Sequence, residues 1–170
     1  MNSTHNLDTI KLSTAGFSFG SSNISLDSTS LNIGIVVSTW NNHITDILLD
    51  GAIQELIEFG LTENQIHISK VPGAFELPLG AQWHFNSNNN IDAVLCLGCV
   101  IKGDTPHFDF VCTGAMNGIM DVGLKFNKPC IFGVITTNTE QQAFDRAGGS
   151  HGNKGNEAAQ TALQLLSLSK

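Results

Sequence analysis

Apolar residues along the chain follow two spacings in turn, one typical of strands and one typical of helices. Short runs rich in apolar and β-branched residues predict strands over residues 31–37, 65–71, 92–101 and 129–137, the first of them buried. Apolar residues at helical spacing predict helices over residues 43–60, 75–85, 106–126, 139–147 and 153–169. Strands that alternate with helices predict an α/β domain with a central four-stranded parallel sheet, covered on both faces because each crossover helix must bury one side against it.

The predicted helix ends carry recognisable start and stop signals. Gly60 supplies a C-cap for the first helix, and Thr139 supplies an N-cap for the fourth. Before the third helix, Thr105 is the expected N-cap, which places Pro106 at the first helical position and His107 at the second. A histidine is therefore expected at the N-terminus of a helix that directly follows the most apolar strand.

The chain divides into one domain and a preceding arm. Its 170 residues, 41% of them hydrophobic, suffice for a single domain with a buried core, which we place at residues 31–170. Residues 1–30 are rich in Ser, Thr and Asn and predict a loose arm, with room for short strand pieces at residues 10–13 or 17–19. Neither an internal repeat nor a second domain is expected.

Charge and hydropathy exclude some classes of partner. A formal net charge of -7, with 8 scattered basic residues, disfavours nucleic-acid binding, which needs clustered Lys and Arg. The longest wholly apolar run, residues 93–101, is far shorter than the ~20 residues of a membrane-spanning helix. Because residues 1–30 resemble neither a secretory signal nor a transit peptide, we expect a cytoplasmic protein without membrane contact.

The cysteines lie within apolar segments and are expected to be buried thiols in a reducing compartment: Cys96, Cys99, Cys112 and Cys130. Cys96 and Cys99 form a C-x-x-C, which raises a metal or redox interpretation that His107 and Cys112 would complete. Residues three apart on a strand point to opposite faces, so the sulfur atoms of Cys96 and Cys99 cannot share a metal ion. Geometry therefore disfavours a metal protein.

Ligands of open α/β sheets bind beyond the carboxyl ends of the strands, which brings four predicted loops into one site. Trp40 is either a lid on the core or a stacking platform for a flat ligand. Glu76 either accepts hydrogen bonds from a ligand or complements a helix dipole. His107 is either a proton-transfer group or a surface histidine, and Arg146 either pairs with a phosphate or caps a C-terminal carbonyl.

Five segments, in this order, resemble the lumazine synthase family: TWN, VPGAFELP, GCVIKGDTPHFDFV, FGVITTNTEQQAFDRAG and GNKGNEAA. The resemblance covers about residues 31–168 and implies a flavodoxin-like, three-layer αβα fold. It implies the condensation of 5-amino-6-(D-ribitylamino)uracil with 3,4-dihydroxy-2-butanone 4-phosphate to 6,7-dimethyl-8-ribityllumazine, phosphate and water, without cofactor or metal. This is the penultimate step of riboflavin biosynthesis. The alternative is a non-catalytic homologue that forms a shell or binds flavin.

The resemblance also implies roles for individual residues. His107 matches the family's proton-transfer residue, and the phosphate-binding positions are Asp104, Thr105 and Arg146. The substrate-binding positions are Trp40, Asn41, Ala74, Phe75, Glu76, Cys99, Val100, Ile101 and Phe132. Because family members contribute the positions of Phe132 and Arg146 from the neighbouring subunit, the site is expected between subunits.

Family members assemble as pentamers or as twelve pentamers in a hollow icosahedral shell. The turn at residues 147–155 carries no insertion, which favours the shell. Such a shell leaves room for an enclosed partner enzyme such as riboflavin synthase. The chain departs from the family pattern in its long N-terminal arm, at His151, and at Lys102, where an arginine is common.

Overall fold

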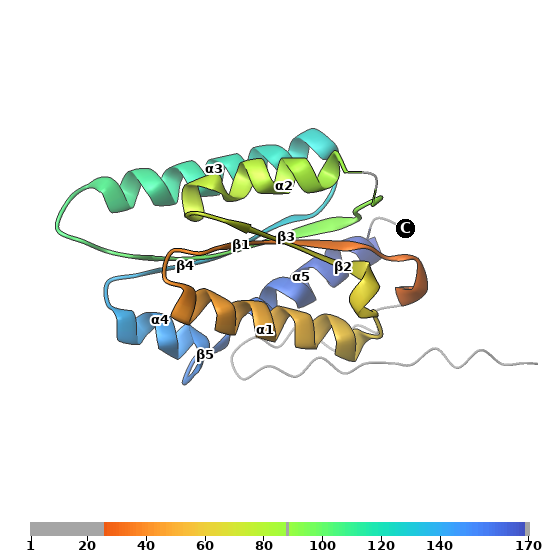
Figure 1. Cartoon of the computed structure of the whole chain (residues 1–170), viewed down its shortest axis with the longest axis horizontal. Coiled ribbons are helices and arrows are strands. Elements are labelled where there is room, and N and C mark those ends of the chain that lie inside the picture. Colours follow the sequence, from red (N-terminus) through yellow and green to blue (C-terminus); the bar gives the residue numbers. More distant parts are fainter. Residues whose placement is uncertain (1–25, 88, 169–170) are drawn as a thin grey trace, which may run out of the picture.

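A four-stranded parallel sheet forms the centre of the computed structural model, which describes residues 26–87 and 89–168 (Figure 1). Its strands are β1 (Ile33–Ser38), β2 (Ile66–Val71), β3 (Ala93–Ile101) and β4 (Cys130–Thr137). They pair in the order β2-β1-β3-β4, so that Ile35 of β1 lies opposite Ile68 on one side and Leu95 on the other. The predicted strands and their parallel arrangement are confirmed. The strand pieces expected at residues 10–13 or 17–19 lie outside the described residues.

Within residues 26–87 and 89–168, five α-helices cover the sheet in two layers. They are α1 (Asn42–Phe59), α2 (Leu77–Phe85), α3 (His107–Phe126), α4 (Glu140–Arg146) and α5 (Lys154–Leu168). Figure 1 shows α2 and α3 above the sheet and α1, α4 and α5 below it, which confirms the three-layer fold. In the part of the chain that the structure describes, no helix combines the length and the hydropathy needed to cross a membrane.

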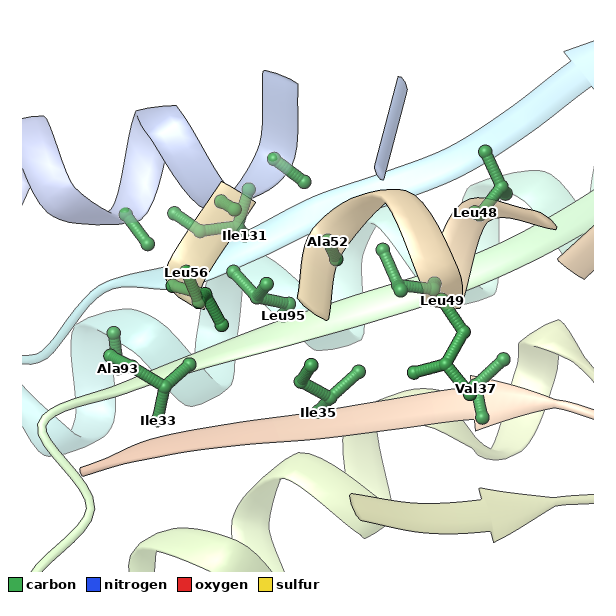
Figure 2. Packing of buried hydrophobic residues seen from close by; sticks show 14 of the residues in the cluster. Ile33, Ile35, Val37, Leu48, Leu49, Ala52, Leu56, Ala93, Leu95 and Ile131 are labelled. Atoms are coloured by element: carbon green, nitrogen blue, oxygen red, sulfur yellow. The ribbon is translucent and has the colours of Figure 1, made fainter. Parts of the chain in front are cut away.

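Alternation along the strands divides the core into two clusters. Odd-numbered residues of β1, such as Ile33 and Ile35, pack with α1 and α5, as Figure 2 shows for the α1 side. The even-numbered Val36 joins the cluster beneath α2 and α3. Because each face of β1 meets its own helical layer, every residue of this strand is buried.

The helix ends bear out most of the predicted signals. Gly60 adopts the left-handed conformation with φ 109°, and its N–H donates to the carbonyls of Leu56 and Ile57. The side chain of Thr139 accepts from the N–H of Gln142, as expected for an N-cap.

The predicted start of α3 is wrong by one residue. Pro106 occupies the N-cap position without a side-chain hydrogen bond, and His107 is the first helical residue. Thr105 therefore does not cap this helix. Pro106 still suits this place because it has no N–H to leave unpaired.

A short antiparallel hairpin follows α4, where the sequence indicated a glycine-dense turn. Its strands are β5 (Ala147–Gly149) and β6 (Gly152–Asn153), and Gly148 and Gly152 have φ of 126° and 74°, a region that favours glycine. Asn153 then anchors α5 to α1, because its side-chain amide donates to the carbonyl of Ile47. Gly155, the second residue of α5, lies directly against the backbone of α1.

We expect Gly155→Ala to destabilise the protein by about 3 kcal/mol, the upper end of the usual cost of overpacking. An added Cβ would collide with the backbone carbonyl of Leu48, which cannot move aside as a flexible side chain can. Urea unfolding followed by circular dichroism at fixed protein concentration measures the change. Gly103→Ala is the control, since a Cβ there meets nothing within 4 Å. Equal stability of the two variants would contradict the close approach of α1 and α5.

Candidate active site

A cavity of about 680 Å³ lies at the carboxyl ends of β1, β2 and β3. It is lined by Trp40, Asn41, Pro72, Gly73, Ala74, Phe75, Glu76, Cys99, Val100, Ile101, Gly103, Thr105, His107, Phe108, Phe110 and Val111. The structure thus brings together most of the residues singled out from the sequence. Asp104 is exposed and does not line the cavity, although its sequence neighbours Gly103 and Thr105 do.

The turn between β1 and α1 presents an exposed aromatic ring at this cavity. Trp40 is 73% exposed, which contradicts its interpretation as a lid on the core, while its role as a stacking platform stays a prediction. The backbone N–H of Trp40 donates to the carbonyl of Pro72 (2.9 Å). Asn41 follows in the left-handed conformation, with φ 58° and ψ 43°, and its amide donates to the carbonyl of Cys99 (3.0 Å). These two hydrogen bonds tie the turn to the ends of β2 and β3.

The segment after β2 forms one wall of the cavity. A single turn of 3-10 helix, Ala74–Glu76, precedes α2 and holds Phe75 at the surface with 59% exposure. Oε2 of Glu76 accepts a hydrogen bond from the N–H of Gly73 (3.0 Å). One carboxylate oxygen therefore stabilises the local turn, and the exposed residue also lines the cavity.

His107 is the first residue of α3, and it lines the cavity together with the segment that follows β3. Its side chain is exposed, and neither ring nitrogen is engaged by another group of the described chain. The N–H groups of Asp109 and Phe110 donate to the carbonyl of Pro106 (3.0 and 3.5 Å), which leaves those of His107 and Phe108 as the N–H groups at the start of α3 without a helical partner. His107 and the N-terminus of α3 thus lie together at one edge of the site.

Phe132 and Arg146 lie apart from this cavity. Both line a second hollow of about 480 Å³, which runs along β4 and α5 and shares no residue with the first. Nη1 of Arg146 donates to the carbonyl of Gln142 (2.9 Å), so within this chain it caps its own helix as the alternative interpretation predicts. A single chain therefore does not bring the two sets of predicted residues together.

Lys154 also lines the second hollow, although the sequence analysis did not assign it a role. Its Nζ forms an ion pair with Glu157 (2.7 Å) on the same helix. The sequence contained only a weak signal, a lysine among glycines in a pattern that is not a phosphate-binding loop. Lys154 lines the same hollow as Arg146 because α5 packs beside β4.

A model of the 6,7-dimethyl-8-ribityllumazine synthase family matches residues 30–170. The 6,7-dimethyl-8-ribityllumazine synthase of Cytophaga hutchinsonii is 57% identical over 133 residues, which is 78% of this chain and 83% of the relative. The enzymes of the same name from Parabacteroides distasonis and Bacteroides fragilis are 49% and 51% identical over 84% and 80% of this chain and 89% and 94% of their own lengths. The chain belongs to the lumazine synthase family.

The two central-strand thiols of this lumazine synthase family member, Cys96 and Cys99, are poorly suited to act as nucleophiles. Burial raises the pKa of Cys99 to about 11, with a smaller contribution from the Glu140 carboxylate. The pKa of Cys96 is also raised, because its thiol shares a hydrogen bond with Cys130 and is fully buried. Cys96 and Cys99 pack in opposite core clusters, as strand geometry predicts. The described residues contain no group of three metal-ligating side chains.

We expect Cys99 to resist alkylation by iodoacetamide at pH 7.5. A thiol with a pKa of about 11 is a thiolate in only on the order of one molecule in a few thousand at this pH, and the thiolate is the reactive form. Mass spectrometry of labelled peptides should show the rate rising about ten-fold for each pH unit up to pH 9. The chain unfolded in guanidinium provides the control. Native labelling as fast as in the unfolded chain would contradict the raised pKa.

Proposed function

We propose that this chain condenses 5-amino-6-(D-ribitylamino)uracil with 3,4-dihydroxy-2-butanone 4-phosphate to give 6,7-dimethyl-8-ribityllumazine, phosphate and water. This is the penultimate step of riboflavin biosynthesis. The observation that carries the proposal is the cavity in which residues of three separate loops meet, from Trp40 to His107, all of them within the range that the family model matches. The fourth loop expected in this site, the one after β4, does not line the cavity within one chain. The relatives named as synthases, up to 57% identical, support the same reaction.

The chemistry accounts for the composition of the cavity. The nucleophile is the aromatic amine of the pyrimidine substrate, so the protein does not need a nucleophile of its own, and the high pKa of Cys99 is no obstacle. The enzyme must juxtapose two substrates and move protons during imine formation, phosphate elimination and ring closure. His107 is the proposed proton-transfer group, since it lines the cavity with its ring nitrogens free to meet a substrate.

The pyrimidine and its ribityl chain are proposed to bind at the strand ends. Trp40 offers an exposed ring for stacking, with Asn41 beside it. The remaining proposed contacts are Ala74, Phe75, Glu76, Cys99, Val100 and Ile101, all of which line the cavity. Backbone groups at strand ends and one carboxylate suit a ligand rich in hydroxyl and ring N–H groups.

The phosphate of the second substrate is proposed to bind at the start of α3. Thr105 lines the cavity there, Asp104 precedes it, and the free N–H groups of the helix end attract a dianion. Arg146 is proposed to pair with the same phosphate from a neighbouring subunit, with Phe132 closing the aromatic cleft. Separation of the two hollows within one chain supports this division, and Lys154 adds a second cation to the hollow of Arg146.

Self-association is part of the proposal, because a composite site needs a second copy of the chain. Exposed apolar side chains on α3 support it, since Phe110, Met120 and Leu124 are 72%, 57% and 74% exposed. We propose pentamers in the cytoplasm, built from the domain at residues 31–170 behind an arm at residues 1–30. Because the hairpin Ala147–Asn153 is short, we further propose that the pentamers assemble into an icosahedral shell. Riboflavin synthase, enclosed in such a shell, is the proposed further partner.

We expect Arg146→Ala to reduce turnover to near the uncatalysed background, because the phosphate loses its cation. His107→Ala should slow turnover by roughly 100-fold yet leave a rate above background, since proximity still accelerates the reaction. Lumazine absorbance and fluorescence after mixing both substrates measure these rates. Gln141→Ala on the exposed side of α4 is the matched control. No turnover by correctly assembled wild-type protein would leave a non-catalytic shell or flavin-binding protein.

Mixed assemblies test whether the site lies between subunits. His107→Ala and Arg146→Ala chains, unfolded and reassembled together in equal amounts, should regain activity in about a quarter of their sites, because one chain supplies each intact residue. Assemblies of either variant alone provide the baseline. A mixture no more active than the mean of its components would place both residues in the same subunit's site.

A further inference from the structure

A hydrogen-bonded pair joins the first turn of α1 to the first residue of α4. Nε2 of His43 lies 2.7 Å from Oε1 of Glu140, although the two residues are 97 positions apart. The imidazole also packs at a tilt against the ring of Phe144, with 5.7 Å between ring centroids. Both side chains of the pair are about half exposed, so neither is required to fill the core.

On α1, His43 lies two residues after Asn41, which belongs to the proposed pyrimidine site. Asn41 holds the left-handed conformation and donates to the carbonyl of Cys99. Asn tolerates this conformation better than other non-glycine residues. On the strand side, hydrogen bonds to the carbonyls of Pro72 and Cys99 hold the turn. On the helix side, the His43–Glu140 pair is the contact that joins it to α4.

The α4 end of the pair is firmly placed. Thr139 caps α4, and the N–H of Asn138 donates to the side chain of Gln142 (2.9 Å). The strand end before it is tied to β3, since the N–H of Lys102 donates to the carbonyl of Thr137 (2.8 Å). Glu140 therefore offers a fixed acceptor beside the ends of β3 and β4.

We propose that the His43–Glu140 pair positions the turn of Trp40 and Asn41 for binding of the pyrimidine substrate, an inference that rests on the proposed function. The imidazole donates from Nε2 whether it is neutral or cationic, so the link does not need a charged histidine. An exposed pair changes a local equilibrium by at most roughly five-fold. A change of this size is small for folding but is measurable as a change in substrate affinity.

Kinetics of His43→Ala, Glu140→Ala and the double variant test the proposal. We expect each single variant to raise KM for the pyrimidine amine by roughly three- to five-fold, with kcat and KM for the butanone phosphate nearly unchanged. The double variant should be no worse than either single one, because both remove the same contact. His43→Gln keeps an amide donor of similar reach and should restore most of the affinity.

An exposed hydrogen bond on the same helix provides the matched control. The side-chain amide of Gln54 donates to Oε1 of Glu58 (2.8 Å) in the second half of α1, more than ten residues after the Trp40 turn. Gln54→Ala should leave KM for the pyrimidine unchanged. Effects of His43→Ala and Glu140→Ala that simply add, or an equal effect of Gln54→Ala, would overturn the positioning role.

Fluorescence of the substrate-free protein separates this inference from the proposed reaction. In a Trp83→Phe background, Trp40 is the remaining tryptophan, and its anisotropy decay reports motion of the turn. His43→Ala should add a faster decay component that His43→Gln does not. If wild-type protein shows no turnover but this change occurs, the reaction is wrong and the turn contact stands. Unchanged anisotropy and unchanged KM would refute the contact's role.

Discussion

Parallel pairing of β1 with both β2 and β3 is the constraint on which the rest of this structure depends. Parallel neighbours require crossover connections, so each strand is followed by a helix that must be packed on one face or the other. With both faces covered, β1 is buried throughout, and the apolar content of its sequence follows from that burial. Parallel strands also end at the same edge, which gathers three loops distant in sequence into one cavity.

Strand order determines what a single chain can and cannot assemble. β1 and β3 are central, whereas β4 lies at the edge with one neighbour, β3. Phe132 of β4 and Arg146 at the end of α4 consequently line a hollow of their own, apart from His107. The proposed composite site follows from this arrangement, since the edge of one chain is the surface on which the cavity of another can be completed.

Some elements of this fold were predictable from the sequence and others were not. The strands and the caps at Gly60 and Thr139 were predictable because hydrophobic spacing and local capping act over a few residues. Thr105 was misassigned as a cap because both Thr105 and Pro106 are acceptable at a helix start, and only the path of the chain after β3 decides between them. The hairpin of β5 and β6 was missed because its strands are two and three residues long, too short to show a period.

The sequence by itself determined the order of strands and helices and the set of polar and aromatic residues at the strand ends, because these depend on local spacing and on the shared edge of a parallel sheet. Only the tertiary structure decided that Trp40 is exposed, that Arg146 lies apart from His107, and that Lys154 lines the same hollow as Arg146. The pairing of His43 with Glu140 likewise joins residues 97 positions apart. Such contacts depend on how helices pack across a sheet, and packing between distant segments leaves no periodic signal in the chain.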